Sequence, residues 1–289
     1  MKGKSVDRVV VNKEIMDEVV GLCRRAGEAI LEVYARSDLG IEVKSDESPL
    51  TAADLAAHHI LVAGLEGLLE GVPVLSEEAA APPFSERSQW QRYWIIDPLD
   101  GTKEFIKRSG EFTVNVALVE HHVPVLGVVH VPVSGVTYTG LSGTGAYKLE
   151  GDQPGQAIAV RTMGGRGAAD KPVTVVASRS HGAGAVDDLL ARLAQDLGKT
   201  DTCNMGSSLK LCLVAEGSAD IYPRLAPTME WDTAAAQAVV EAAGGEVLNF
   251  DLEPLRYNQK DELLNPYFYV LGDTAFPWRD LLSGLEVER

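Results

Sequence analysis

Residues 94–105 read WIIDPLDGTKEF, and the rest of the chain is best interpreted outward from this stretch. Its apolar start, residues 94–96, predicts a buried strand. A proline and a glycine follow within five residues, and both favour a turn. The strand is therefore expected to deliver Asp97 and Asp100 into a turn at its end.

The two aspartates are three residues apart, so their side chains and the Leu99 carbonyl can converge on one small volume. That many oxygen ligands suit a hard divalent cation. Thr102 adds a hydroxyl, and the backbone N–H groups from Gly101 onward can bind an anion if a helix begins there. The simpler alternative is a solvated turn, in which the aspartates bond only to their own backbone. The apolar strand before them favours the site.

The composition is that of a folded, acidic protein. The 289 residues are 45% apolar and 24% charged, which is enough for one large domain or two packed halves. A formal net charge of −16 repels nucleic acid and anionic membranes, so nucleic acid is not an expected partner. Any anionic ligand must therefore meet a local group of cations.

The sequence also bears on the expected location of the protein. No apolar run approaches the ~20 residues of a membrane span, so any membrane association is expected to be peripheral. Residues 1–13 mix charges with apolar residues, which predicts no secretory signal. The three cysteines, Cys23, Cys203 and Cys212, are odd in number and lack metal-ligand spacing. We expect reduced thiols in a cytoplasmic protein, not a disulfide or a nucleophile.

Two helices are expected before the central stretch. Residues 12–34 and 53–69 both place apolar residues at helical spacing, and Thr51 is a suitable N-cap for the second helix. Asp54 lies near that N-terminus, where it either complements the helix dipole or takes part in a site. Both interpretations remain open from the sequence.

A third carboxylate follows the short apolar strand expected at residues 72–75. The adjacent acids Glu77 and Glu78 come directly after it, and such a pair is commonly just solvated. A carboxylate from a second strand end is nevertheless what a divalent site at Asp97 and Asp100 needs. Residues 79–89 look like an exposed loop.

After the central stretch the pattern becomes antiparallel. Residues 112–120 and 123–133 are apolar and β-branched, and residues 138–149 suggest a further hairpin. The histidine pair at the first turn, His121 and His122, is expected to be solvated and not to bind metal. From residue 151 to 170 the composition shifts to glycine and small residues, so we place the boundary between residues 1–160 and 161–289.

The second half alternates strands and helices, which predicts an α/β layer. Asp232 stands at the start of a helix that Gly244 and Gly245 end, and the ordinary role for such an aspartate is an N-cap. Possible anion contacts also follow strands or begin a helix, as α/β proteins bind phosphate. These contacts are Arg179, His181, Ser207, Lys210 and Arg224.

Four separated motifs now carry a family resemblance: SPLTAAD, LSEE, DPLDGTKEF and WDTAAAQAVVEAAGG. In order and spacing they resemble the inositol monophosphatase superfamily of metal-dependent, lithium-sensitive phosphatases. The KEF after DPLDGT, with IKRSGEFTVNVAL and GSSLKLCLVAEGSADIYPR, resembles most its 3'(2'),5'-bisphosphate nucleotidase branch. The resemblance covers roughly residues 14–269.

The resemblance implies a fold and a site. The fold would be an α/β/α/β/α layered sandwich, with an α+β N-terminal half that binds metal and an α/β C-terminal half that binds substrate. Two or three Mg²⁺ ions would be bound by Glu77, Asp97, the Leu99 carbonyl, Asp100 and Asp232. Thr102, oriented by Asp54, would act with Glu77 to activate a water. Substrate would contact Glu77, Leu99, Asp100, Gly101, Thr102, His181, Ser207, Lys210, Arg224 and Asp232.

The implied reaction is hydrolysis of the 3'-phosphate of 3'-phosphoadenosine 5'-phosphate, and possibly of its 5'-phosphosulfate, to clear a by-product of sulfate assimilation. A phosphomonoester repels nucleophiles, so clustered carboxylates that hold cations suit this chemistry. No Cys, His or Ser stands in a nucleophile-elbow context, which disfavours a covalent intermediate. The alternatives are an inositol or sugar phosphatase on the same site and, from another class, a non-catalytic nucleotide or metal sensor. A monomer and a homodimer both fit.

Overall fold

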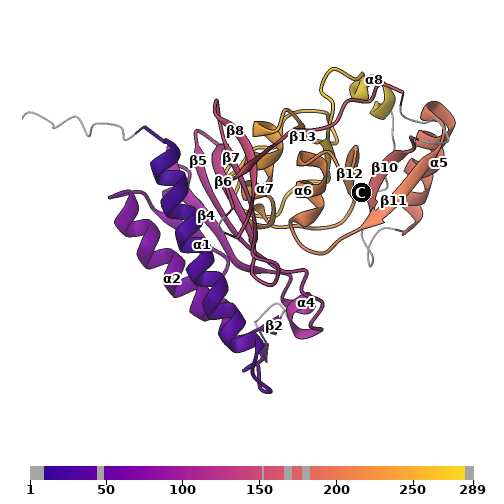
Figure 1. Cartoon of the computed structure of the whole chain (residues 1–289). Helices are drawn as coiled ribbons and strands as arrows, with labels where there is room; N and C mark the ends of the chain where they lie inside the picture. The colour runs from indigo at the N-terminus through magenta and orange to yellow at the C-terminus, as the bar shows by residue number, and fades with distance from the viewer. Residues whose placement is uncertain (1–9, 44–48, 152, 166–170, 178–182, 284–289) are drawn as a thin grey trace, which may run out of the picture.

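The structure is a computed structural model of the chain, and it describes residues 10–43, 49–151, 153–165, 171–177 and 183–283. The elements stack in five alternating layers of helix and sheet (Figure 1). The expected layered sandwich is therefore confirmed.

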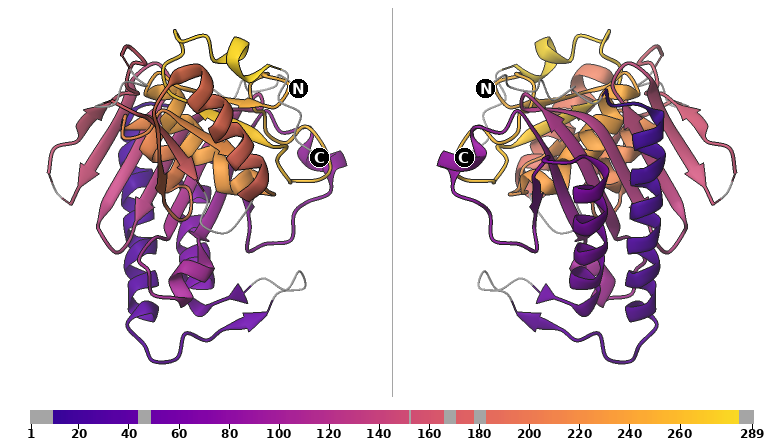
Figure 2. Two further views of the ribbon diagram at one scale, coloured as in Figure 1. Left: turned by 90° about the vertical axis from the view of Figure 1, so that its right-hand side faces the viewer. Right: turned by 90° about the vertical axis from the view of Figure 1, so that its left-hand side faces the viewer.

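The first layer is a pair of helices, α1 (Lys13–Tyr34) and α2 (Ala52–Leu68), which lie side by side over one sheet face (Figure 2). Their N-termini are capped, since Asn12 accepts from the Ile15 N–H at 3.1 Å and Thr51 accepts from the Ala53 N–H at 3.2 Å. The Thr51 cap predicted from the sequence is confirmed. A short hairpin, β1 (Glu42–Val43) and β2 (Pro49–Leu50), leads into α2.

The second layer is a seven-stranded sheet with the strands in chain order. Only its first two strands are parallel, and every other pair is antiparallel. The strands are β3 (Val74–Ser76), β4 (Arg92–Asp100), β5 (Thr113–Glu120), β6 (Val123–Val131), β7 (Val136–Leu141), β8 (Gly145–Glu150) and β9 (Gln156–Ile158).

The fourth layer is a five-stranded sheet of order β11-β10-β12-β14-β13. Its strands are β10 (Val173–Ala177), β11 (Thr200–Asn204), β12 (Ile221–Arg224), β13 (Glu246–Asn249) and β14 (Phe268–Leu271). Helices α5 (Ala183–Leu197) and α8 (Trp278–Leu282) form the fifth layer, where Leu193 and Trp278 pack into one apolar cluster with the sheet.

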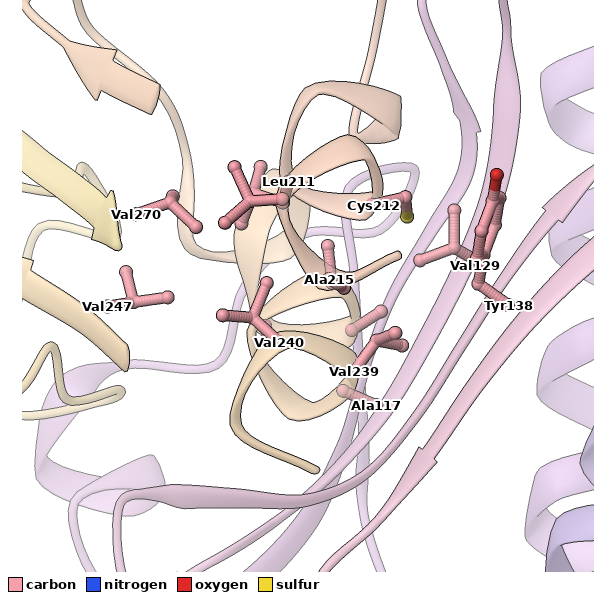
Figure 3. Packing of buried hydrophobic residues seen from close by; sticks show 14 of the residues in the cluster. Ala117, Val129, Tyr138, Leu211, Cys212, Ala215, Val239, Val240, Val247 and Val270 are labelled. Carbon is pink, nitrogen blue, oxygen red and sulfur yellow. The ribbon is translucent and has the colours of Figure 1, made fainter. Parts of the chain in front are cut away.

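The middle layer joins the two sheets. Helices α6 (Leu209–Ala215) and α7 (Glu230–Ala242) lie between them and contribute apolar side chains to one continuous core. Figure 3 shows this packing, with Leu211 and Val240 facing the second sheet and Val239 facing the first. The C-terminal half thus completes the core of the N-terminal sheet.

Helix α7 approaches that sheet very closely because two glycines leave room for it. A Cβ on Gly127 would lie 2.1 Å from the Ala235 carbonyl oxygen, and one on Gly140 would lie 2.5 Å from that of Ala238. Both distances are far shorter than any contact a real side chain makes. The depth at which α7 sits is therefore set by the absence of side chains at these two positions.

One expectation for a connecting segment was wrong. Residues 79–89 are not a plain exposed loop, since they contain α3 (Phe84–Arg87), whose Arg87 is only 1% exposed. The turn expected at His121 and His122 is present: His121 is exposed, and the His122 Nδ1 lies 2.7 Å from the Tyr257 carbonyl oxygen. Among the described helices, none combines the length and the apolarity needed to cross a bilayer.

Candidate active site

Strand pairing brings Glu77 and Asp97 together. Strands β3 and β4 are parallel, with Ser76 opposite Ile96, so the next residue of each strand emerges at the same sheet edge. The Glu77 N–H donates to the Ile96 carbonyl at 3.2 Å, which extends this register by one residue. Two carboxylates from separate segments thus become neighbours, as the sequence predicted.

The aspartates of β4 lie on a β-bulge and not in a turn that closes the strand. Asp97 pairs with Asn115 and Asp100 with Thr113, so two residues on β4 face one on β5. Of the two residues expected to turn the chain, Pro98 does not, because pairing resumes at Asp100. Gly101 does, and its φ of 96° is open mainly to glycine.

The bulge also aims a backbone carbonyl. The Leu99 N–H donates to the Asp97 Oδ1 at 3.0 Å, and the Thr102 hydroxyl donates to the Leu99 carbonyl oxygen at 3.4 Å. A helix does begin after Gly101, namely α4 (Thr102–Ile106), as the anion-binding interpretation required.

Asp232 comes from the C-terminal half. The sequence predicted that Asp232 is the N-cap of α7, and this prediction was wrong. Helix α7 begins two residues earlier, so Asp232 is its third residue. Its Oδ2 accepts from the Met229 N–H at 2.9 Å, so the side chain folds back over the helix start. The N-cap position is occupied by Met229, which is not a typical capping residue, so the sequence did not indicate this earlier helix start.

The three carboxylates of Glu77, Asp97 and Asp232 form a cluster. One oxygen of each lies within 4.8 Å of the others, and this is the cluster of potential metal ligands found among the described residues. Burial, with repulsion from Glu77 and Asp100, raises the pKa of Asp97 well above its ordinary value. Burial and repulsion from Asp100 raise the pKa of Asp232 in the same way.

This donor set fits a hard divalent cation. Carboxylate oxygens are the ligands that Mg²⁺ prefers in proteins, and buried carboxylates repelling one another need a compensating positive charge. Burial and mutual repulsion also cause the raised pKa values of Asp97 and Asp232. The cluster can therefore bind a metal.

Asp100 is not one of the three carboxylates of this cluster, and its Oδ2 accepts hydrogen bonds from groups of both halves. That oxygen accepts from the Ser208 N–H and the Ser208 hydroxyl, each at 2.6 Å. Asn115 Nδ2 lies 3.3 Å and Thr113 Oγ1 3.4 Å from the same oxygen. The sequence analysis singled out Ser207 and missed Ser208, because no pattern within the GSS triplet distinguishes the two hydroxyls.

Asp54 serves both purposes that the sequence left open. Its Oδ2 accepts from the Thr51 N–H at 2.8 Å and from the Thr51 hydroxyl at 2.5 Å, which completes a capping box at the start of α2. Its Oδ1 lies 3.4 Å from the Thr102 hydroxyl. A helix cap therefore reaches the site through its second oxygen.

A cleft of about 420 Å³ opens beside the carboxylates, and Asp100 and Asp232 line it. Four cationic side chains line it as well: Lys103, Lys107, Lys210 and Arg224. Lys103 lies on α4 and Lys107 directly follows it, and neither was predicted, because charged residues at a short helix carry no pattern of their own. The predicted cations Lys210 and Arg224 do reach the same cleft.

The two predicted cations are held by carbonyl groups. Lys210 Nζ lies 3.4 Å from the Met205 carbonyl oxygen, and burial lowers the pKa of this lysine. Arg224 donates to the Ala226 and Pro227 carbonyls at 3.0 and 2.9 Å. Both side chains are thereby fixed at the cleft wall.

Ser207 contributes to the same wall. Its Oγ is buried and has no hydrogen-bond partner among the described residues, and its φ of 46° is unusual for a residue with a side chain. Strained backbone and an unused donor are common where a ligand binds. The predicted contacts Arg179 and His181 lie outside the described residues.

The chain matches known proteins over most of its length. Residues 12–274 match the model of the Inositol monophosphatase family. The chain is 48% identical over 257 residues to the 3'(2'),5'-bisphosphate nucleotidase CysQ of Escherichia coli K12, covering 89% of this chain and 99% of that protein. Against the protein of the same name from Haemophilus influenzae the identity is 35% over 275 residues, covering 95% and 99%.

Solved structures show the same fold. The crystal structure of CysQ from Bacteroides thetaiotaomicron superposes with a TM-score of 0.79 at 44% identity, covering 92% of this chain and 99% of that one. The Thermotoga maritima inositol monophosphatase superposes with a TM-score of 0.73 at 22% identity, covering 94% and 96%, and supports the fold alone.

Proposed function

The chain belongs to the inositol monophosphatase family, and from this membership we propose that it removes the 3'-phosphate of 3'-phosphoadenosine 5'-phosphate to give AMP and phosphate. It is a phosphatase that acts on bisphosphonucleotides. The adenosine base, and activity on the 5'-phosphosulfate, are the finer parts of the proposal.

One observation carries the assignment: a carboxylate cluster and a group of cations line the same cleft. Asp232 belongs to the cluster and also lines the cleft, whose wall carries Lys210 and Arg224. A substrate with two separated phosphates needs both features, one for the phosphate that is cleaved and one for the phosphate that stays. A single-phosphate sugar would leave the cations without a partner.

We propose Mg²⁺ as the ion, bound as two or three ions by Glu77, Asp97, the Leu99 carbonyl, Asp100 and Asp232. The clustering of three of these carboxylates within 4.8 Å supports the ligand set. When bound, such ions neutralise the phosphate and lower the pKa of a water molecule. The shared metal motif also implies inhibition by lithium.

The chain's own groups would then orient the reactants. The Thr102 hydroxyl lies 3.4 Å from both the Asp54 Oδ1 and the Leu99 carbonyl oxygen, and it has one proton. Donating that hydrogen bond to Asp54 would leave the threonine lone pairs for the attacking water. Glu77 would take up the proton that this water releases. The N–H groups of Gly101 and Thr102, at the start of α4, would hold the phosphate that is cleaved.

The remaining phosphate would lie against the cations of the cleft. Ser207 has a donor hydroxyl without a described partner, and Lys210 and Arg224 supply positive charge at fixed positions. His181 stays a proposed contact from the family resemblance. The reaction would take place in the cytoplasm, where clearing this nucleotide serves sulfate assimilation, and all three cysteines are free as expected there.

Phosphate release by the purified protein in Mg²⁺ tests the assignment. The substrates are 3'-phosphoadenosine 5'-phosphate, inositol 1-phosphate and fructose 1,6-bisphosphate at equal concentration. We expect kcat/KM to favour the nucleotide by about a hundredfold or more, which corresponds to about 2.7 kcal/mol of transition-state discrimination.

The other outcomes separate the alternatives. Preference for the inositol or sugar phosphate would keep the metal site and overturn the substrate. Absence of hydrolysis with every substrate would point to a sensor. Asp100→Asn separates the two classes, because a hydrolase should lose turnover while staying folded, whereas a sensor should still respond to its ligand.

A further inference from the structure

The turn made by Gly206, Ser207 and Ser208 fastens the C-terminal half to the N-terminal half beside the carboxylates. Its first residue donates its N–H to the Glu111 Oε2 at 2.8 Å. Its last residue contacts Asp100 on the bulged end of β4. The segment between them adopts the left-handed conformation at Ser207, which lets both ends face the N-terminal half.

Ser208 is the centre of this contact. Its N–H and its hydroxyl both donate to the Asp100 Oδ2 at 2.6 Å, and its Oγ accepts from Asn115 Nδ2 at 2.6 Å. The residue is 2% exposed, so water does not compete for these bonds. Three segments far apart in sequence thereby meet at one hydroxyl.

The chemistry of a hydroxyl shows which bond dominates. A serine hydroxyl carries one proton, and two acceptors lie within reach: the Asp100 Oδ2 at 2.6 Å and the Asp232 carbonyl oxygen at 2.9 Å. The carboxylate is charged and closer, and charge-assisted bonds of this kind are short and strong. The proton therefore lies toward Asp100, while the Asp232 carbonyl limits how far Ser208 can shift.

We infer that Ser208 is a positioning residue that fixes the Asp100 carboxylate for metal binding. Ser208 holds Oδ2 from one side, and none of the described hydrogen bonds uses the other oxygen, Oδ1, which is left for an ion. The inference rests on the proposed function, in which Asp100 is a Mg²⁺ ligand. Partners that orient a ligand typically matter about tenfold or more for metal affinity.

The test compares Ser208→Ala with the wild type by calorimetric titration of Mg²⁺ into the metal-free protein without substrate. We expect the Kd for Mg²⁺ to rise roughly tenfold, while KM for the nucleotide at saturating Mg²⁺ changes little. Ser218→Ala is the matched control, because its hydroxyl also donates to a carboxylate, Glu216 at 2.8 Å, away from the site. The control should bind Mg²⁺ as the wild type does.

A Ser208→Ala protein that binds Mg²⁺ with the wild-type Kd would overturn the inference. Should that variant fail to fold, Ser208→Cys keeps nearly the same volume but offers only a weak S–H donor, and the same loss of affinity is expected. Wild-type affinity in the cysteine variant would equally overturn it. Failure of the wild type itself to bind Mg²⁺ or to release phosphate would instead count against the proposed function.

Discussion

Asp97 is buried among other acids, and its substitution should separate stability from activity. Because burial and repulsion raise its folded pKa above the unfolded value, ionising it destabilises the metal-free fold as pH rises. We expect Asp97→Asn to raise the Tm of the metal-free protein at neutral pH. We also expect kcat/KM to fall roughly a thousandfold or more, since a metal contributes several kcal/mol to transition-state stabilisation.

Thermal melts in a chelator and phosphate-release assays in Mg²⁺ check both expectations for Asp97. Leu126→Ala is a useful comparison, since it truncates a fully buried apolar residue and should lower Tm. An Asp97→Asn protein that melts earlier than wild type without metal would contradict the electrostatic account.

Thr102 provides a sharper test of the proton pathway. Its hydroxyl is the group within reach of both Asp54 and the Leu99 carbonyl, so Thr102→Val removes the donor while keeping the volume. We expect kcat to fall about a hundredfold with KM little changed, in the range typical of acid–base groups. Thr102→Ser keeps the hydroxyl and should retain most activity, and equal losses in the two variants would refute the role.

At the scale of single elements, the sequence pattern predicted which helices and strands form better than it predicted where they begin and end. The capped helix at Thr51 and the buried strand before Asp97 follow from residues adjacent in sequence. Helix α7 was placed too late because Met229 has no capping side chain, and tertiary packing starts it earlier. The bulge at Asp97 and Asp100 depends on pairing with β5, which no local pattern contains.

Strand β6 contains a titratable group that should govern acid stability. Burial lowers the pKa of His130 to about 4, below the ordinary value of 6.5, and its Nδ1 lies 2.9 Å from the Thr137 hydroxyl. Since the folded pKa is below the unfolded one, the unfolded chain binds more protons between pH 6.5 and 4. Stability is therefore lost as pH falls through this range, by about 2 kcal/mol between pH 7 and 5.

His130→Gln should remove that contribution. We expect its free energy of unfolding in urea to change less between pH 7 and pH 5 than that of the wild type, by about 2 kcal/mol. Parallel profiles for wild type and His130→Gln would disprove the assignment.

At the scale of the whole molecule, the two halves are joined by contacts that sequence could not reveal. Alternating strands and helices predicted an α/β layer for the second half, and the family resemblance implied the layered sandwich. Arg87 donating to Asn258 at 2.5 Å and Ser208 donating to Asp100 link residues 171 and 108 positions apart. Such pairs form only when both sheets pack on α6 and α7. The acidic motifs could therefore be predicted from the sequence, whereas the residues that hydrogen-bond to them could not.

Ion binding should show in the stability of the whole protein. A bound Mg²⁺ ion would relieve the repulsion between carboxylates from both halves, so Mg²⁺ should raise Tm, with about 2.7 kcal/mol of stabilisation at a hundred times its Kd. Removal by a chelator should reverse the shift and abolish hydrolysis. At limiting Mg²⁺, lithium should inhibit, and full activity in high lithium would argue against a shared metal chemistry.

Gly127 and Gly140, which lie against α7, should be sensitive to substitution when activity is measured across all positions of the chain. A methyl group at Gly127 or Gly140 would press on the helix that carries Asp232 and move that carboxylate relative to Glu77 and Asp97. In a genetic screen for loss of activity, these small, chemically inert residues would score like acids of the site. A tolerance map would then mark them as essential, although neither lines the cleft.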